Sequence, residues 1–236
     1  MVKPLLPPAY ELVVLERDQR AFAHGRRAAA RGVEDGTLYW TERNDRLELA
    51  LVLEPEAPIE TTLEVVHLFA VAAGDALGAH TAPAFPLAIR FPDRIIFDVF
   101  ELARLRWAWG EIPEAGIPPW FLLGLEAEIF EPEESGHMPD RITLRGAGLE
   151  TAASAPLVES LARHFLYWVA RWQDEGFAPV RAAWNQRCEN RGRRGHFARN
   201  GIEAAGIVEG LDAQGRYVIG GRAISLLELG RDPEGA

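Results

Sequence analysis

Residues 205–219 read AGIVEGLDAQGRYVI, and this stretch indicates the type of structure formed by the C-terminal part of the chain. Two apolar runs flank Asp212-Ala213-Gln214-Gly215, whose residue types favour a tight turn. The surrounding segment, residues 201–228, has the same pattern of short apolar runs and turn residues. It therefore predicts a small, compact unit of short β-strands.

Two predicted helices lie directly upstream of this unit. Ser154 and Pro156 are typical of a helix start, and apolar residues at helical spacing follow them to Gly176. A shorter helix is expected from Phe177 to about Cys188. The small β unit therefore follows a pair of helices.

Strands and helices are mixed in the remaining part of the chain. Strand-like runs are found at residues 10–15, 36–41, 46–53, 87–91, 95–97, 102–109 and 120–130. Helical patterns are found at residues 17–31 and 58–78, whereas residues 140–151 are expected to be irregular. This order predicts an α+β domain over residues 1–188 and a small β-barrel-like domain over residues 189–236.

Composition narrows the classes of function. The 236 residues carry a formal net charge of -10, which argues against nucleic-acid binding through many phosphate contacts. A single cysteine, Cys188, allows no internal disulfide and fits a reducing compartment. The first residues lack the apolar run of a signal peptide, so we expect a cytoplasmic protein that binds neither nucleic acid nor membrane.

Three motifs resemble those of one enzyme family. Gly176-Phe177-Ala178-Pro179 followed by Trp184 is similar to the G-[LF]-x-P…W pattern of biotin protein ligases, and residues 206–215 match their G-x-x-x-G-[IL]-D-x-x-G. Arg90-Phe91-Pro92-Asp93-Arg94 stands where that family has K-W-P-N-D. The order of elements is similar as well, so the chain resembles the biotin/lipoate protein ligase family over nearly its whole length.

The resemblance implies a fold and an activity. The fold would be a mixed β-sheet packed with helices, followed by a small SH3-like barrel. Such ligases join the carboxylate of biotin or lipoate to the α-phosphate of ATP and pass the acyl group to a lysine. An active member would use ATP with magnesium, and its partners would be a small carboxylate ligand and a biotinyl or lipoyl carrier domain.

The chain departs from the family at the nucleotide-binding loop. The resemblance predicts a loop rich in glycine and arginine between the second and third strands, but residues 41–46 read TERNDR. Glycine matters there because a chain without Cβ lets its amides approach a pyrophosphate closely. The loop is therefore degraded.

The catalytic lysine of the family is also missing. Counting forward from Asp93 places Glu101 at its position, where a carboxylate near a phosphate would cost about 4 kcal/mol. A slip in the alignment would bring Arg104 or Arg106 there instead. These two arginines are the candidate catalytic residues if the protein is active, although arginine does not reproduce the compact charge of lysine.

A ligand-binding cleft is expected between the strands at residues 36–53 and those at residues 90–109. The residues expected to line it are Trp40, Glu42, Arg43, Arg46, Arg90, Phe91, Pro92, Asp93, Glu101, Trp107 and Gly124. The resemblance implies a strand rich in Gly, Ile and Asn that contacts biotin, and Gly124 is what remains of it here. The tryptophans fit either an apolar pocket or ordinary packing between strands.

Other candidate sites have plainer interpretations. Cys188 could act as the nucleophile of an acyltransferase, as in related octanoyltransferases, if a partner favoured its thiolate. The six histidines lack metal-ligand spacing, so no metal site is expected. Residues 190–197, NRGRRGHF, form either an exposed turn or a basic patch for an acidic acceptor surface or a phosphate.

Two functional hypotheses follow, and a third is plainer. In the first, the protein is a diverged relative with weak or no ligase activity that binds a small carboxylate, a nucleotide or a carrier domain. In the second, it is an active acyl-adenylate-forming ligase or acyltransferase that uses relocated arginines. In the third, it is a structural or regulatory subunit without a small ligand.

Overall fold

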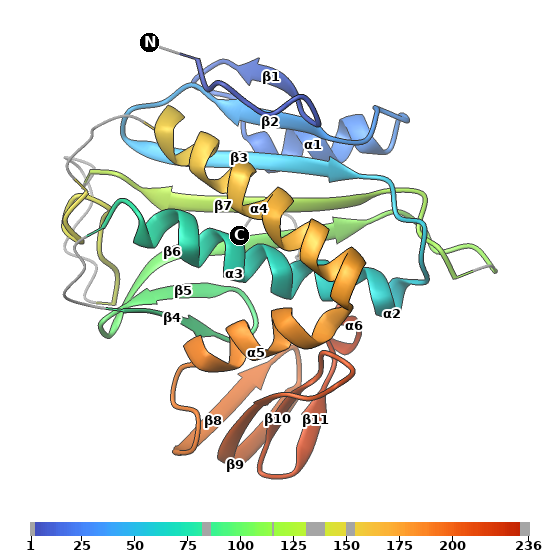
Figure 1. Ribbon diagram of the computed structural model, residues 1–236, viewed down its shortest axis with the longest axis vertical. Helices are drawn as coiled ribbons and strands as arrows, with labels where there is room; N and C mark the ends of the chain where they lie inside the picture. The colour runs from blue at the N-terminus through green and yellow to red at the C-terminus, as the bar shows by residue number, and fades with distance from the viewer. Residues whose placement is uncertain (1–2, 82–85, 115, 131–139, 150–153, 232–236) are drawn as a thin grey trace.

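Two β-sheets and six helices make up the part of the chain that the computed structural model describes, residues 3–81, 86–114, 116–130, 140–149 and 154–231. The larger sheet has the strand order β1-β2-β3-β7-β6-β5-β4, and the smaller sheet has the order β11-β10-β9-β8. Figure 1 shows the smaller sheet below one end of the larger one. The α+β architecture predicted from the sequence is confirmed.

The larger sheet is mixed because β1 and β2 are parallel and the other pairs are antiparallel. Its strands are β1 (Glu11–Leu15), β2 (Thr37–Thr41), β3 (Arg46–Leu53), β4 (Leu87–Arg90), β5 (Arg94–Phe97), β6 (Phe100–Trp109) and β7 (Phe121–Glu128). The central strands β3, β7 and β6 are long, and side chains on successive residues point to opposite faces. Each of these strands therefore contributes to two different surfaces.

One face of this sheet is covered by helices. The helices are α1 (Ala21–Ala29), α2 (Ile59–Thr62), α3 (Glu64–Gly78), α4 (Ala155–Glu175), α5 (Phe177–Arg187) and α6 (Leu226–Leu229). In Figure 1, α3 and α4 lie in front of the sheet, and the leucines of β3 at positions 47, 49 and 51 join their core. By length and composition residues 59–78 could cross a membrane, but this segment is 78% buried within the protein as its core helix.

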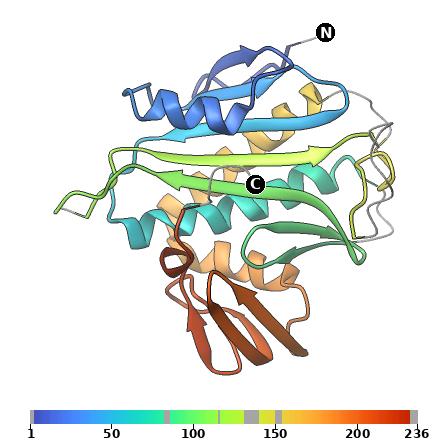
Figure 2. The ribbon, with the colours of Figure 1, turned by 180° about the vertical axis from the view of Figure 1, so that it is seen from behind.

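Among the described residues, α1 is the only helix that covers the opposite face. Figure 2 shows α1 in front of β2 and β3, while β6 and β5 have no helix in front of them. Beneath α1 a small apolar cluster includes Tyr39, Ala50 and Leu122. We call this side of the sheet the open face.

The small C-terminal sheet is antiparallel and packs against the end of the larger sheet. Its strands are β8 (Arg194–Arg199), β9 (Ile202–Leu211), β10 (Tyr217–Ile219) and β11 (Arg222–Ile224). Phe91, which follows β4, stacks on Tyr217 with 4.4 Å between ring centroids. Buried His67 of α3 lies 2.8 Å, Nε2 to oxygen, from the carbonyl of Gly215 in the turn quoted above. The two sheets are thus joined by specific contacts, and a domain boundary at residue 188 stays a prediction.

Most predicted elements are found, and the two largest differences in their bounds concern helices. The first helix is shorter than residues 17–31 and begins at Ala21, because the Gln19 amide bonds the Glu16 carbonyl in a preceding turn. The predicted helix over residues 58–78 is divided into α2 and α3 at Leu63. Residues 140–149 form no helix or named strand, as expected, while residues 150 and 151 lie outside the described part.

Candidate ligand-binding face of the sheet

The open face carries a band of charged side chains next to the apolar cluster under α1. On β3, Arg46 and Glu48 point to this side, and Glu48 is directly opposite Glu126 of β7. Glu126 in turn is opposite Arg104 of β6, and Arg106 is opposite Gly124. The alternation of the strands therefore brings five ionisable residues from three strands onto one surface.

Glu126 is the centre of this band. Its carboxylate lies 2.7 Å from Nη2 of Arg46, 3.1 Å from Nη1 of Arg106 and 3.7 Å from Nη2 of Arg20. Burial acts to raise the pKa of Glu126, but the neighbouring arginines outweigh it and the pKa is lowered. Glu126 is therefore ionised at neutral pH and is itself the ion-pair partner of these three arginines.

Glu48 links the band to α1. Its side chain is fully buried, and Oε1 accepts a hydrogen bond of 2.8 Å from the amide of Ala21 at the first turn of the helix. Arg20 Nε lies 3.2 Å from the same oxygen. Burial raises the pKa of Glu48 despite these partners. This carboxylate fixes where α1 begins, because it satisfies an amide that the helix leaves without a partner.

The surface above Gly124 is filled by side chains of the protein. A Cβ at Gly124 would come within 2.5 Å of Cδ2 of Phe22, so the ring lies directly on the strand. The guanidinium of Arg106 lies over the face of this ring, 4.3 Å from its centroid. A ligand that contacts Gly124 would have to displace Phe22.

A second charged cluster lies at the turn between β4 and β5. Asp93 is buried, and Oδ2 is 2.7 Å from Arg94 Nη1, 2.8 Å from Arg199 Nη1 and 3.6 Å from Arg104 Nε. Arg199 belongs to β8, so Asp93 ties the small sheet to the larger one. Asp93 was predicted to line a cleft, but its carboxylate lies between the two sheets and pairs with an arginine of each.

Glu101 lies on the open face with its charge balanced. Its Oε2 is 2.6 Å from Nε of Arg94, and Arg141 Nε is 3.8 Å from its other oxygen. The cost predicted for a carboxylate at this position is reduced by these two cations. Glu101 nevertheless occupies the place where the resemblance requires a lysine.

The connection between β2 and β3 is the four residues from Glu42 to Asp45. Arg43 in it donates to its neighbour Asp45, with 3.0 Å from Nε to Oδ1. The indole of Trp40, before the connection, is fully buried and donates to Oγ of Ser154. The connection is too short to wrap an adenylate, and its arginine is already paired.

Several predicted cleft residues lie elsewhere. Trp40 and Trp107 point to the helix-covered face, since Trp107 is buried and its Nε1 donates to the Gly230 carbonyl. Arg90 lies at the sheet edge in a two-bond ion pair with Glu189. A cleft was predicted between the strands at residues 36–53 and those at residues 90–109. This prediction is wrong, because β7 pairs with both β3 and β6 and the strands form one continuous sheet.

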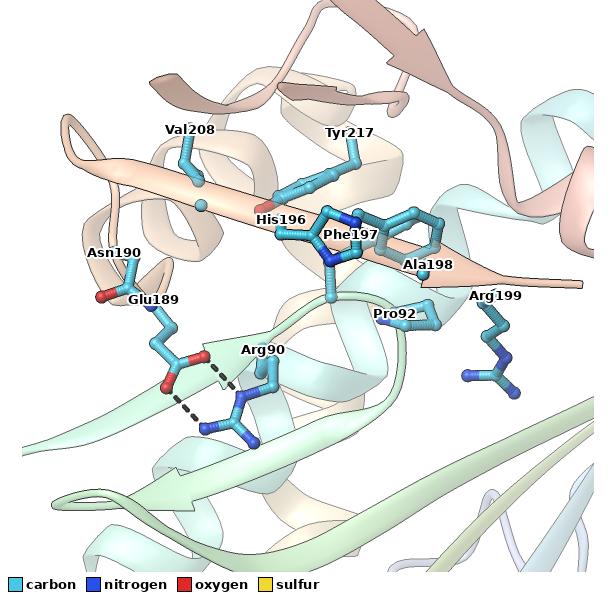
Figure 3. Close-up of a pocket in the computed structure, with 12 residues that line it drawn as sticks. Arg90, Pro92, Glu189, Asn190, His196, Phe197, Ala198, Arg199, Val208 and Tyr217 are labelled. Atoms are coloured by element: carbon cyan, nitrogen blue, oxygen red, sulfur yellow. Dashed lines mark hydrogen bonds and ion pairs between the residues drawn. The ribbon is translucent and has the colours of Figure 1, made fainter. Parts of the chain in front are cut away.

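A groove of about 320 Å³ lies at that sheet edge, between the turn after β4 and strand β8 (Figure 3). It is lined by Arg90, Phe91, Pro92, Glu189, Asn190, Gly195, His196, Phe197, Ala198, Arg199, Val208 and Tyr217. Three residues of the R-F-P-D-R motif thus belong to a groove beside the small sheet. The motif lies where the two sheets meet. The sequence alone did not indicate this position.

Cys188 does not have the surroundings of a nucleophile. Burial raises the pKa of its thiol to about 12, although Arg191 acts in the opposite direction. The thiolate is therefore scarce at neutral pH. Among the described residues, no group of three histidine, cysteine, aspartate or glutamate side chains could hold a metal ion.

Comparison with known proteins places this architecture in a family. A sequence model of the biotin/lipoate A/B protein ligase family matches residues 6–186, more than half of the chain. The chain belongs to this family. The biotin–[acetyl-CoA-carboxylase] ligase of Paracoccus denitrificans is 27% identical to this family member over 181 residues, which cover 73% of each chain.

Solved structures share its fold. A biotin protein ligase-like protein of unknown function from Silicibacter sp. TM1040 has a TM-score of 0.87 and 24% identity, covering 98% of this chain and 100% of that one. The biotin protein ligase of Aquifex aeolicus has a TM-score of 0.73 and 16% identity, covering 91% and 95%. These identities support the fold alone, and the resemblance seen in the sequence is confirmed at the level of the family.

Three residues at the centre of the open face were not predicted as site residues: Phe22, Glu48 and Glu126. A signal existed for Glu48, because the strict alternation of residues 46–49 places Arg46 and Glu48 on one side of the strand. The position of Phe22 depends on how α1 crosses the sheet, which no local pattern reveals.

Proposed function

We propose that this family member does not form an acyl-adenylate and acts by binding a carrier domain. The observation that carries the proposal is the filled open face, where Phe22 covers Gly124 and Glu126 occupies the arginines around it. A small carboxylate would have to compete with a carboxylate that is part of the protein.

The surroundings of a triphosphate are also missing from the residues that the structure describes. Phosphate binding favours backbone amides that converge in a glycine-rich loop. The β2–β3 connection has no glycine and holds Arg43 on Asp45. Arg104 and Arg106, the candidates for an active enzyme, face Asp93 and Glu126. The residues present therefore do not fit ATP with magnesium.

What the chain retains favours a protein partner. The whole two-sheet frame is kept, since 98% of the chain superimposes on a relative of the same build. Ligases of this family act on biotinyl or lipoyl carrier domains. Docking a carrier domain requires an exposed surface rather than an enclosed pocket, and much of the open face is uncovered by helices (Figure 2).

The first experiment is ATP–pyrophosphate exchange with biotin, lipoate and octanoate supplied separately, and an active biotin ligase in parallel. We expect no exchange above background from the folded protein. Exchange that depends on one of these acids would overturn the proposal and support the alternative, an active ligase that uses relocated arginines.

The second experiment measures binding of purified biotinyl and lipoyl carrier domains, in their apo and modified forms, by calorimetry. Arg141, exposed beside Glu101, is replaced by glutamate, and the matched control replaces Arg181 of α5 on the helix-covered side. We expect Arg141→Glu to change the affinity by about tenfold and Arg181→Glu to leave it unaltered. Equal effects of the two variants, or no binding of either carrier domain, would contradict docking on the open face.

A further inference from the structure

Strand β8 is an edge strand that borders the groove of Figure 3. Five consecutive residues of β8, from Gly195 to Arg199, line the groove. A groove over one face of a sheet would be lined by alternate residues, because successive side chains point to opposite faces. The groove therefore runs along the edge of the strand.

The direction of the backbone groups follows from the pairing with β9. The carbonyl of Arg193 accepts a hydrogen bond from Val208, whereas the carbonyl of Ile207, opposite Arg194, accepts one from Gly220 on the other side. Backbone groups alternate in direction along an antiparallel strand. Those of Arg194, His196 and Ala198 therefore point away from β9, toward the open edge.

The chain segment that contains this edge is basic although the protein is acidic, and Glu189 of the groove is paired with Arg90. Residues 190–200 contain four arginines and one histidine and no acidic residue, in a chain with a net charge of -10. Arg193 and Arg194 are exposed, and neither has an ion-pair partner among the described residues. These two cations are available to an incoming anion, in contrast to the paired arginines of the open face.

The floor of the groove is aromatic. Phe91 stacks on Tyr217, and its ring centroid lies 5.4 Å from that of Phe197. On the far side, the two-bond ion pair between Arg90 and Glu189 forms a wall, as the dashed lines of Figure 3 show. Strand addition obtains affinity from the backbone and specificity from hollows that receive alternate side chains. Here the groove combines an open backbone edge with an aromatic floor against which the side chains of an added strand would pack.

We propose that the edge of β8 binds an extended, acidic segment of a partner protein by strand addition. The outward backbone groups of Arg194, His196 and Ala198 would pair with the segment, and Arg193 and Arg194 would neutralise its carboxylates. The stretch from Arg194 to Ala198 is about 16 Å long, enough for a strand of roughly five residues. This site is separate from the open face and does not depend on whether the protein forms an adenylate.

The test uses two displayed libraries of eight-residue peptides, one with Asp or Glu alternating with any residue and one with Lys in place of the acids. We expect enrichment from the acidic library alone, and binding of the selected peptides that weakens as salt is added. Their binding should shift the amide resonances of Arg194, His196 and Ala198. Enrichment from neither library, or equally from both, would overturn the proposal.

Two variants locate the binding. Ala198→Pro removes an amide N–H that points into the groove. This N–H takes no part in the β8–β9 hydrogen bonds, so the sheet is retained. Ala198→Ser is the control for this variant. Arg193→Glu with Arg194→Glu reverses the free charges, and Arg27→Glu with Arg31→Glu, on exposed positions around the end of α1, is the matched control. We expect about tenfold weaker binding from each test variant and unaltered binding from each control.

Two other occupants of the edge would be recognised in the same experiments. If the protein forms a dimer that Ala198→Pro dissociates and the peptides do not displace, the occupant is a second copy of this chain. If inorganic phosphate at low millimolar concentration abolishes binding and shifts only Arg193 and Arg194, the basic patch is a phosphate site. Either result would overturn the assignment to an extended acidic segment.

Discussion

The two faces of the larger sheet are built from alternate residues of the same strands, yet they differ in what they contain. Leu105 and Trp107 of β6 point to the helices and are buried in the main core, while Arg104 and Arg106 point to the open face. The helix-covered face is closed by apolar packing, and the open face holds ion pairs. Successive residues of one strand therefore contribute in turn to the apolar core and to the charged surface.

This difference explains how the family can keep its fold while its chemistry changes. Burying a leucine side chain contributes about 1.5–3 kcal/mol, whereas an ion pair at a partly exposed position contributes about 1 kcal/mol or less. Most of the stability therefore comes from the helix-covered face. Partly exposed side chains of the open face can be exchanged at lower cost than buried leucines, so membership of the family fixes the frame more firmly than the activity.

The largest expected effect tests this division within two adjacent residues. Leu105→Ala removes a side chain with no exposed surface and should lower the free energy of unfolding by about 2–5 kcal/mol. Arg104→Ala, the matched change on the other face, should cost about 1 kcal/mol or less, because Asp93 keeps Arg94 and Arg199. Urea unfolding measures both, and a larger loss for Arg104→Ala would show that the open face carries the fold.

The second prediction concerns pH and the contact between the two sheets. Burial lowers the pKa of His67 to about 4, although its hydrogen bond to Gly215 and the charge of Asp212 act in the opposite direction. In the unfolded chain His67 has a pKa of about 6.5, so below this pH it binds a proton that the folded protein does not bind. The free energy of unfolding should therefore fall by about 3 kcal/mol between pH 6.5 and pH 4.

The comparison that isolates His67 is His67→Gln, which keeps a donor for Gly215 but does not titrate in this range. Urea unfolding from pH 7.5 to pH 4 should show a smaller loss for the variant than for the wild-type protein. Parallel curves for the two proteins would mean that His67 is protonated in the folded state and that other groups cause the acid sensitivity.

The third prediction addresses the centre of the open face. Glu126→Gln leaves Arg20, Arg46 and Arg106 without the carboxylate they share, and the free energy of unfolding should fall by about 1.5–3 kcal/mol. The loss should be smaller at 1 M salt, since added ions screen the arginines. The same variant removes the internal carboxylate, so binding of biotin, lipoate or octanoate by Glu126→Gln but not by wild type would show that Glu126 blocks a carboxylate site.

The sequence predicted the order of strands and helices because hydrophobic alternation and helix stop signals are local. The alternation at the start of residues 46–53 indicated one buried face of β3, but residues 47–52 are buried on both faces, because Ala50 and Val52 lie in the apolar cluster under α1. The motif around Gly210 and Asp212 correctly indicated a terminal β unit and, by resemblance, the family. These features depend on residues that are close together in the chain.

The candidate site was less accessible to prediction because its contacts join distant parts of the chain. Phe91 and Asp93 were assigned to a cleft, but their partners Tyr217 and Arg199 lie more than 100 residues away. Trp40 and Trp107 were assigned to the same cleft, yet both point to the helices. Which face a strand residue occupies depends on register, and a shift of one residue reverses it.

Glu101→Lys is expected to have the smallest effect, and it tests the alignment with the family motif directly. If a lysine at this position were sufficient to hold a phosphate, ATP affinity should rise in the variant. We expect no measurable rise, because the β2–β3 connection lacks glycine and Arg94 lies against the introduced charge. The loss of the Glu101–Arg94 pair should cost about 1 kcal/mol or less, with Glu101→Gln as the control for that loss. Tighter ATP binding by Glu101→Lys than by Glu101→Gln would show that a phosphate site survives on the open face and would favour the ligase alternative over carrier binding.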